Sequence, residues 1–314
     1  MPSPSVAVID LGSNSIKLLV AIRDEHGHLV SILSRTLDVR IGAGISQTPP
    51  RLSENGMAAG LEAVQTLLAD TKPFAPGTTI LVATSAVRDA ANGAEFRKRI
   101  ETATGHRLLI LSGDEEADLI GRGLLSDPQL GRFQDFYVFD LGGGSLECLS
   151  FRKRRSVAAV SFPLGCVRLT ELYVADPSAP FGERENESVR HAVAQTFRSG
   201  GFRFDLGLSA QAVFTGGTMT TTRAALAHTR GQTLSESPAQ LSVEEIATVF
   251  RRVADMTLAE RRASPDLPAA RADVFPAALA TILEIAHLGR LESFHHSVCN
   301  LRWGLADRTL PTGA

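Results

Sequence analysis

The N-terminal part of the chain alternates between apolar runs and one short polar turn. Val6–Ile9 is apolar and leads through Asp10 into the turn Gly12–Ser15, and apolar residues return from Ile16 to Val20. Short apolar runs on both sides of a turn rich in glycine and serine are typical of two β-strands joined by a tight connection. We therefore predict a strand, a turn and a second strand at the start of the chain.

The same pattern appears again in the middle of the chain. Tyr137–Phe139 is hydrophobic and is followed by Asp140, then by a run of three glycines that ends at Ser145. Asp140 matches Asp10, and Ser145 matches Ser15, at one constant offset along the chain. Two copies of one element at a domain-sized spacing predict two related domains.

The rest of the chain alternates between segments with helical periodicity and short apolar runs. The predicted helices cover residues 53–71, 90–101, 166–173, 185–197, 242–256 and 269–288. The predicted strands cover residues 79–83, 107–111, 158–162 and 212–214. Alternating strands and helices indicate an α/β protein. Because no low-complexity linker interrupts the pattern, we place the domain boundary near residues 121–129, within a crossover connection.

Composition and charge narrow the class of protein. Lys and Arg number 32 against 34 Asp and Glu, a net charge of −2, which argues against a protein that wraps nucleic acid. The three cysteines are far apart and include no C-x-x-C pair, so we expect neither disulfides nor a zinc site, and a reducing compartment, the cytoplasm. Asp10 and Lys17 interrupt the N-terminal apolar stretch, so we also expect no membrane span, which needs about 20 apolar residues.

Three turns built from Gly, Ser, Thr and Asn each follow a predicted strand. Glycine lets the backbone approach a ligand and direct N–H groups at an anion such as phosphate. An ordinary hairpin is the alternative for any one turn, but three such turns favour phosphate binding. None matches the Walker sequence or the dinucleotide fingerprint. The candidate phosphate-binding residues are Gly12, Ser13, Asn14, Ser15, Gly142, Gly143, Gly144, Ser145, Gly216, Gly217 and Thr218.

Acidic residues accompany two of these turns. Asp10 and Asp140 each end an apolar strand, where a carboxylate is costly unless it binds a cation or hydrogen-bond donors. Phosphate beside carboxylates implies a hard divalent ion, Mg²⁺ or Mn²⁺, and Glu147 could reach the same ion. The alternatives are an Asx turn for either aspartate and an exposed strand position for Glu147. For Asp10 the two interpretations weigh equally, whereas for Asp140 we favour the metal.

The adjacent residues Glu115 and Glu116 are predicted to have different roles. Ser112 and Glu115 have the spacing of a capping box, which occupies Glu115 at the start of a helix. Glu116 has no such duty and could orient or deprotonate a water molecule. A solvated acid in the first helical turn is the alternative.

Two arginines stand alone between apolar segments. Arg88 and Arg271 each need a partner there, either a protein carboxylate or a phosphate group. Both are therefore candidate substrate-binding residues.

Seven segments resemble, in the same order, the motifs of the exopolyphosphatase and guanosine pentaphosphate phosphohydrolase family. They cover residues 8–17, 83–90, 112–117, 139–147, 163–170, 215–218 and 301–305. The resemblance implies two ribonuclease-H-like domains of the actin, hexokinase and Hsp70 superfamily, with a cleft between them. It also implies a first domain over residues 1–124, completed by residues 300–314, and a second over residues 125–299.

The same resemblance implies a reaction and residue roles. Glu116 corresponds to the catalytic glutamate that activates water, and Asp140 and Glu147 to acids that accompany a metal, Mg²⁺ or Mn²⁺. Lys17 and Arg271 correspond to basic substrate contacts. The implied reaction removes the terminal phosphate of inorganic polyphosphate. Guanosine pentaphosphate is the alternative substrate, a non-catalytic nucleotide sensor is the alternative class, and the family implies a homodimer.

Overall fold

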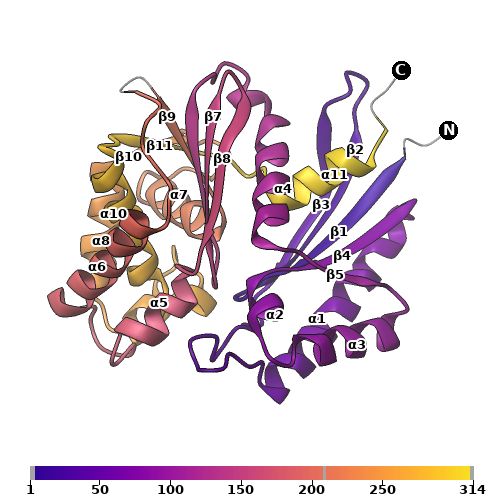
Figure 1. The fold of residues 1–314 in the computed structure, drawn as a ribbon, viewed down its shortest axis with the longest axis horizontal. Helices are drawn as coiled ribbons and strands as arrows, with labels where there is room; N and C mark the ends of the chain where they lie inside the picture. Colours follow the sequence, from indigo (N-terminus) through magenta and orange to yellow (C-terminus); the bar gives the residue numbers. More distant parts are fainter. Residues whose placement is uncertain (1–3, 208–209, 312–314) are drawn as a thin grey trace. The chain divides into compact units, whose positions relative to one another are not determined.

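The computed structural model describes residues 4–207 and 210–311 (Figure 1). Residues 1–3, 208–209 and 312–314, which fall within the predicted domains, lie outside the described residues. The chain divides into two compact units. The first unit joins Met1–Arg132 to the C-terminal segment Cys299–Ala314, and the second unit is Phe133–Val298. The family resemblance placed the boundary between the two domains between residues 124 and 125.

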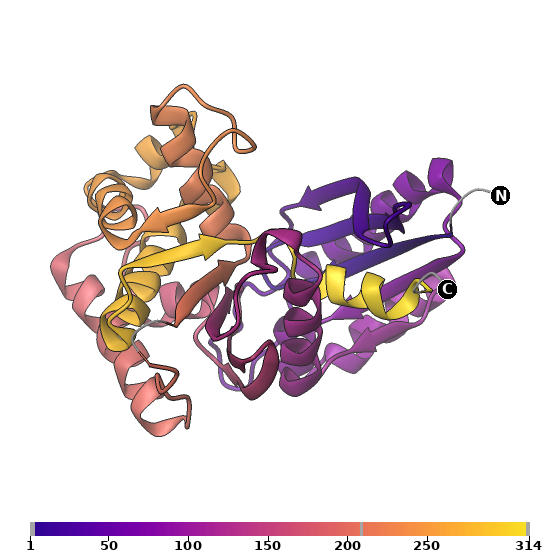
Figure 2. The same cartoon turned by 90° about the horizontal axis from the view of Figure 1, so that it is seen from above.

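The described part of the first unit contains one mixed sheet in the order β3-β2-β1-β4-β5. Its strands are β1 (Ser5–Leu11), β2 (Ile16–Arg23), β3 (Leu29–Leu37), β4 (Thr78–Ala83) and β5 (Leu108–Ile110). Its helices are α1 (Glu54–Thr71), α2 (Ser85–Asp89), α3 (Gly93–Thr104), α4 (Gly113–Leu125) and α11 (Leu301–Thr309), with 3₁₀ turns η1 (Lys72–Phe74) and η2 (Pro128–Leu130). Helices α1 and α3 cover one face of the sheet, and α4 and α11 cover the other (Figures 1 and 2).

The described part of the second unit contains a mixed sheet in the order β10-β11-β9-β6-β7-β8. Its strands are β6 (Phe136–Leu141), β7 (Leu146–Arg152), β8 (Arg155–Phe162), β9 (Gln211–Thr215), β10 (Gln240–Ser242) and β11 (Ser293–His296). Its helices are α5 (Cys166–Tyr173), α6 (Glu183–Ser199), α7 (Gly217–Thr229), α8 (Val243–Ala254), α9 (Leu258–Ala263) and α10 (Phe275–Gly289), with the 3₁₀ turn η3 (Ala269–Arg271). Helix α10 packs against α6 and α8.

The two sheets repeat one topology. In each, the first two strands of the unit pair antiparallel and the first strand also pairs parallel with the fourth. The strand-turn-strand repeat of the sequence forms the same local structure twice. Gly12 N–H donates to Ser15 O over 3.2 Å, and Gly142 N–H donates to Ser145 O over 3.0 Å. The predicted duplication is confirmed, and the second sheet has one additional edge strand, β10.

Burial explains why the central strand of the first sheet reads as a continuous apolar run. Val6, Ala7, Val8 and Ile9 are fully buried, since helices lie over both faces of the sheet. A strand that is covered on both faces needs no polar alternation. The last residues of the strand are therefore where polar chemistry can begin.

Most predicted helices are confirmed, and one begins later than predicted. Helix α1 follows an N-cap at Ser53, and capping boxes at Ser112 and Ser242 start α4 and α8, as the sequence indicated. The helix predicted over residues 269–288 is wrong at its start. Residues 269–271 form η3, and α10 begins only at Phe275, because Pro276 suits a first helical turn and not an interior.

Several elements have no counterpart in the sequence prediction: β3, β10, β11, α2, α9 and α11. Helix α2 is only five residues long, too short to show a helical period. Helix α11 lies against α4 at two glycines, where an added Cβ on Gly304 would lie 1.9 Å from Leu119 O. This backbone contact joins the C-terminal segment to the first unit. No periodic pattern of apolar residues in the sequence predicts it.

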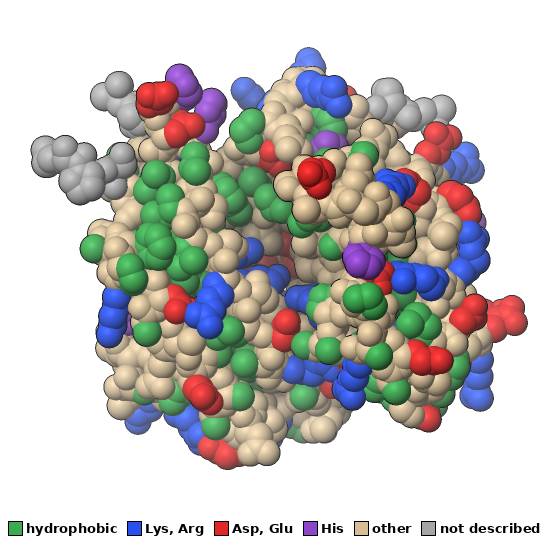
Figure 3. Space-filling model, turned by 180° about the vertical axis from the view of Figure 1, so that it is seen from behind, with side chains coloured by type: hydrophobic (Ala, Val, Ile, Leu, Met, Phe, Trp, Pro, Cys, Tyr) green, Lys and Arg blue, Asp and Glu red, His purple; other side chains and the backbone are tan. Residues whose placement is uncertain are grey.

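The charge on the surface and the hydrophobicity of the helices bear on the expected partners and on the expected absence of a membrane span. Basic and acidic side chains are interspersed over the face that Figure 3 shows, as the near-zero net charge implies. Within the described residues, none of the helices has the length and hydrophobicity that crossing a bilayer requires.

Candidate functional site

Backbone N–H groups of the loop at residues 40–42 donate hydrogen bonds to carbonyl oxygens of the turn between β1 and β2. Ser13 O accepts from Gly42 N–H over 2.8 Å, and Asn14 O accepts from Arg40 N–H over 3.0 Å. The C=O and N–H of a planar trans peptide point in opposite directions. The N–H groups of Asn14 and Ser15 therefore point away from the 40–42 loop, and this side of the turn suits an anion.

The equivalent turn of the second unit is held in the same way by α5. Gly142 O accepts from Cys166 N–H over 3.0 Å, and Gly143 O accepts from Val167 N–H over 2.9 Å. The N–H groups of Gly143 and Gly144 accordingly point away from α5. The structure thus gives both predicted phosphate turns the same polarity, although different elements hold them.

The third turn, between β9 and α7, brings together residues that the sequence singled out separately. Gly216 has a φ of 93°, and a Cβ there would lie 2.5 Å from Asp140 Oδ1. A Cβ on Gly217 would lie 2.5 Å from the guanidinium of Arg271. Thr218 is buried. Only glycine lets the backbone lie this close to a carboxylate and a guanidinium.

Asp10 lies opposite Lys17 in the β1–β2 pair. Its Oδ1 is buried and makes no hydrogen bond among the described residues, so Asp10 is not an Asx acceptor through that atom. Burial raises the pKa of the Asp10 carboxyl, and the positive charges of Lys17 and Arg302 offset this only in part. A buried oxygen without a donor is a position that a cation would satisfy.

Asp140 and Glu147 lie directly opposite one another in the β6–β7 pair, so their side chains share a face of the sheet. Glu147 is 2% exposed and accepts from Ser161 Oγ over 2.8 Å, which rules out the exposed strand glutamate. Burial, and then the Glu147 carboxylate, raise the pKa of the neighbouring Cys148 thiol.

Asp10, Asp140 and Glu147 are the candidate metal ligands. Across the described residues, no three His, Cys, Asp or Glu side chains converge on one metal position. Mg²⁺ is commonly held by one or two carboxylates together with waters and substrate phosphates. The pair Asp140 and Glu147 within the second unit fits that sparse manner of binding, and so does the buried oxygen of Asp10 within the first unit. Neither fits a metal caged by protein ligands alone.

Glu116 is buried and paired. It is 7% exposed, and its Oε2 accepts from Arg88 Nη1 over 2.9 Å, which rules out the solvated acid. Arg88 Nη1 also donates to Leu111 O over 3.1 Å. Helix α2, which carries Arg88, begins at Ser85, and Ser85 Oγ lies 3.1 Å from Ser13 Oγ. The first unit thus links the predicted catalytic acid to a predicted phosphate turn through one short helix.

Three functional candidates escaped the sequence analysis: Ser85, Arg40 and Arg168. Ser85 and Arg168 lie within segments that resemble family motifs, but no local pattern gave them a duty. Arg40 Nε donates to Asn14 Oδ1 over 3.0 Å, and Arg168 Nε donates to Gly144 O over 3.1 Å. The only signal in the sequence was a basic residue two positions before a glycine, in Arg40-Ile-Gly42.

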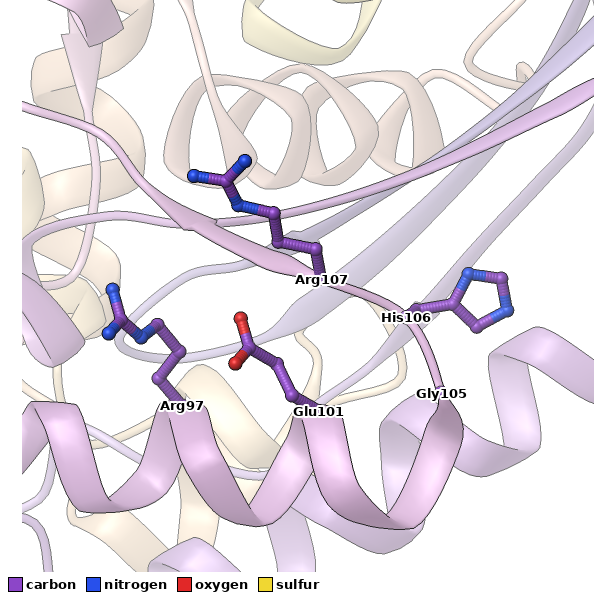
Figure 4. Close-up of a pocket in the computed structure, with 5 residues that line it drawn as sticks. All are labelled: Arg97, Glu101, Gly105, His106 and Arg107. Carbon is purple, nitrogen blue, oxygen red and sulfur yellow. The ribbon is translucent and has the colours of Figure 1, made fainter.

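A cavity of about 380 Å³ in the first unit lies apart from these residues. Its lining is Arg97, Glu101, Gly105, His106 and Arg107, none of which the sequence predicted as a site residue (Figure 4). Figure 4 shows Glu101 directed between Arg97 and Arg107, with His106 turned away. Glu101 is already engaged, because its Oε1 accepts from Leu108 N–H over 3.1 Å. We therefore assign the candidate chemistry to the glycine turns and not to this cavity.

The fold and these groups define a class of protein. Two related α/β units, each with an acid beside a glycine turn of defined polarity, are suited to a phosphate-handling enzyme. A model of the Ppx/GppA phosphatase family matches residues 19–312, and the chain belongs to this family. Membership of this family makes the protein a phosphatase.

Solved structures have the same fold over nearly the whole chain. An exopolyphosphatase from Cytophaga hutchinsonii aligns with a TM-score of 0.87 and 22% identity, over 99% of this chain and 100% of that one. An exopolyphosphatase-like protein aligns with a TM-score of 0.86 and 26% identity, over 98% of each chain. The Aquifex aeolicus PPX-GPPA enzyme aligns with a TM-score of 0.77 and 24% identity, over 98% and 100%. The predicted fold class, an α/β protein with two related domains, is confirmed.

At neutral pH we expect Asp10→Asn to unfold at a higher temperature than the wild type. Burial raises the pKa of Asp10 above its value in the unfolded chain, so the folded state binds the proton more tightly. As the pH rises above about 3.8, ionisation of this group lowers the free energy of unfolding, and the full cost is present above the folded pKa. The neutral amide removes this cost. Melting temperatures from circular dichroism should differ most at neutral pH and converge towards acid pH.

Asp24→Asn is the matched control with the opposite sign. Desolvation alone would raise the pKa of Asp24, but the backbone N–H groups of His28 and His26 donate to its carboxylate and the net pKa is lowered. Its replacement should slightly lower the melting temperature at neutral pH. A melting temperature of Asp10→Asn below that of the wild type at neutral pH would contradict an unfavourably buried charge at Asp10.

Proposed function

We propose that this protein is an exopolyphosphatase, which removes the terminal phosphate of inorganic polyphosphate as orthophosphate. The observation that carries the proposal is the buried Glu116–Arg88 ion pair, connected to the Gly12–Ser15 turn through Ser85. A general base and a phosphate turn on one framework are what hydrolysis of a phosphoanhydride requires. Membership of the Ppx/GppA phosphatase family supports the reaction class.

In this proposal the glycine turns hold phosphate oxygens. Their N–H groups supply fixed donors, and Lys17 and Arg271 supply positive charge. Phosphoryl transfer depends mainly on positioning and on neutralising charge over the transferred group, and not on covalent chemistry by the protein. Groups of this kind recognise phosphate oxygens and need no base or sugar in the substrate, which favours polyphosphate over guanosine pentaphosphate.

Glu116 orients the attacking water and accepts one of its protons. The water oxygen forms a bond to the terminal phosphorus, and the bond from that phosphorus to the bridging oxygen breaks. The electron pair leaves with the bridging oxygen, which ends the shortened chain. Arg88 keeps the carboxylate of Glu116 in one position, since its Nη1 is also held by Leu111 O.

Within the second unit, Asp140 and Glu147 are the residues that would hold Mg²⁺ or Mn²⁺, and Asp10 is the candidate metal ligand within the first unit. When bound, the ion would neutralise charge on the phosphate oxygens. Asp140 would keep its place against Gly216 through the close approach that glycine allows there. Glu147 would keep its orientation through the bond from Ser161 Oγ.

Glu116→Gln should lose about 10² to 10⁴ in kcat while the protein still folds, because the amide preserves the shape but cannot accept a proton. The matched control is Glu115→Gln on the same helix turn, which should keep its rate because glutamine still completes a capping box. Rates of orthophosphate release from polyphosphate measure both. Full turnover by Glu116→Gln would remove Glu116 from the mechanism.

The substrate is decided by orthophosphate release from long polyphosphate, short polyphosphate and guanosine pentaphosphate at one fixed Mg²⁺ concentration. We expect the highest kcat/KM with a polyphosphate. A higher kcat/KM with guanosine pentaphosphate would replace the proposed substrate within the same reaction class. No release from any of the three, together with tight binding of one, would favour the non-catalytic sensor instead.

Asp140→Asn should weaken Mg²⁺ binding about 10- to 100-fold, a loss of the size seen when residues that support a metal are replaced. Isothermal titration with MgCl₂ in the presence of orthophosphate, the reaction product, reads this without turnover. The control is Asp135→Asn, at the other end of β6, where the carboxylate accepts from Lys153 N–H and should not affect the ion. Equal Mg²⁺ affinity in Asp140→Asn and the wild type would contradict the metal assignment.

A further inference from the structure

Each glycine turn that follows a central strand is contacted by an arginine from another part of its own unit. Arg40 Nε donates to Asn14 Oδ1 over 3.0 Å in the first unit. Arg168 Nε donates to Gly144 O over 3.1 Å in the second unit. Both side chains are half-buried. The two contacts occupy corresponding places in the repeat, although the arginines come from unrelated elements, a loop and α5.

The backbone at Arg40 is fixed by the turn that it contacts. Arg40 has a φ of 45°, in the left-handed region that non-glycine residues rarely adopt. Its N–H donates to Asn14 O over 3.0 Å. Two residues on, a Cβ at Gly42 would lie 2.6 Å from Ser13 Cβ, so the loop and the turn are in direct contact. Strained residues held by their surroundings concentrate at functional sites.

Arg168 is fixed by the start of α5. Its N–H donates to Gly143 O over 3.3 Å, in addition to the bond from its side chain. A Cβ at Gly165 would lie 2.3 Å from the backbone of Gly143 and of Gly144, so α5 begins against the turn itself. The carbonyl of Gly144 is engaged by Arg168, and the N–H of Ser145 in the same peptide unit points the opposite way.

We propose that Arg40 and Arg168 are a matched pair of substrate-positioning residues, one for each phosphate turn. Each fixes its turn through Nε from the carbonyl side and adds a permanent positive charge there, so that it acts on the phosphate through the turn and across one peptide unit. This inference rests on the proposed function, because it takes the turns as phosphate sites. A guanidinium suits both duties, since its planar fork presents several donors at once, whereas the lysine ammonium is a point charge on a flexible stem.

The test compares Arg40→Gln and Arg168→Gln with Arg40→Lys and Arg168→Lys, using inorganic tripolyphosphate as the probe. The Gln variants should raise KM about 10- to 100-fold, since each loses the charge-assisted hydrogen bond that holds its turn in place. They should also weaken the dependence of KM on salt, which reports charge and not packing. The Lys variants should keep the salt dependence and recover part of KM. They also keep the test readable where a Gln variant fails to fold.

Two exposed arginines serve as controls. Arg97→Gln lies on α3 of the first unit, in the cavity of Figure 4, and Arg198→Gln lies on α6 of the second unit. Both should keep the KM and the salt dependence of the wild type. The proposal is overturned if the variants at Arg40 and Arg168 also keep both values.

A second readout separates this inference from the proposed function. Tripolyphosphate should raise the melting temperature of the wild type and of both controls, and should raise it less in Arg40→Gln and Arg168→Gln. If the wild type releases no phosphate from any substrate, the proposed function fails, but these shifts still test the arginines. Equal shifts in the wild type and in both Gln variants overturn the inference whether or not the protein is a hydrolase.

Discussion

The candidate site depends on backbone hydrogen bonds that engage the carbonyl side of the glycine turns. In the second unit α5 donates to Gly142 O and Gly143 O, and a loop does the same for the equivalent turn of the first unit. Because a peptide is planar, these bonds fix the direction of the N–H groups without any side chain. In the function that we propose, phosphate binding is therefore built from the backbone, and side chains adjust its charge and its stability.

The acid at the end of the first central strand opposes the stability of the fold. Asp10 has a buried oxygen without a hydrogen-bond donor and a raised pKa, although apolar residues fill the rest of its strand. Asp140 stands in the equivalent place of the second unit, against Gly216. Local rules of folding are commonly broken at functional sites, where stability is exchanged for a charge that chemistry needs. The two acids fit that interpretation better than a structural duty.

How far the sequence predicted the site differs from residue to residue. The different roles of Glu115 and Glu116 could be predicted from local rules, since a capping box depends only on the spacing of residues along one helix. The partner of Arg88 was open between a carboxylate and a phosphate, and the structure shows Glu116 beside it, 28 positions further along the chain. Arg40 and Arg168 were missed, because contact with a turn depends on which loop or helix packs there and leaves no periodic trace.

The sequence by itself determined the duplicated strand-turn-strand element, the α/β class and the glycine turns, because these follow from patterns within a few residues and from one long repeat. Tertiary structure alone decided which groups meet: Glu116 with Arg88, Asp140 with Gly216, and Arg271 with Gly217. It also decided that the C-terminal helix α11 belongs to the first unit, through glycines that let two backbones touch. Such contacts join residues far apart in the chain, and their energy depends on packing geometry, which no local pattern of residues records.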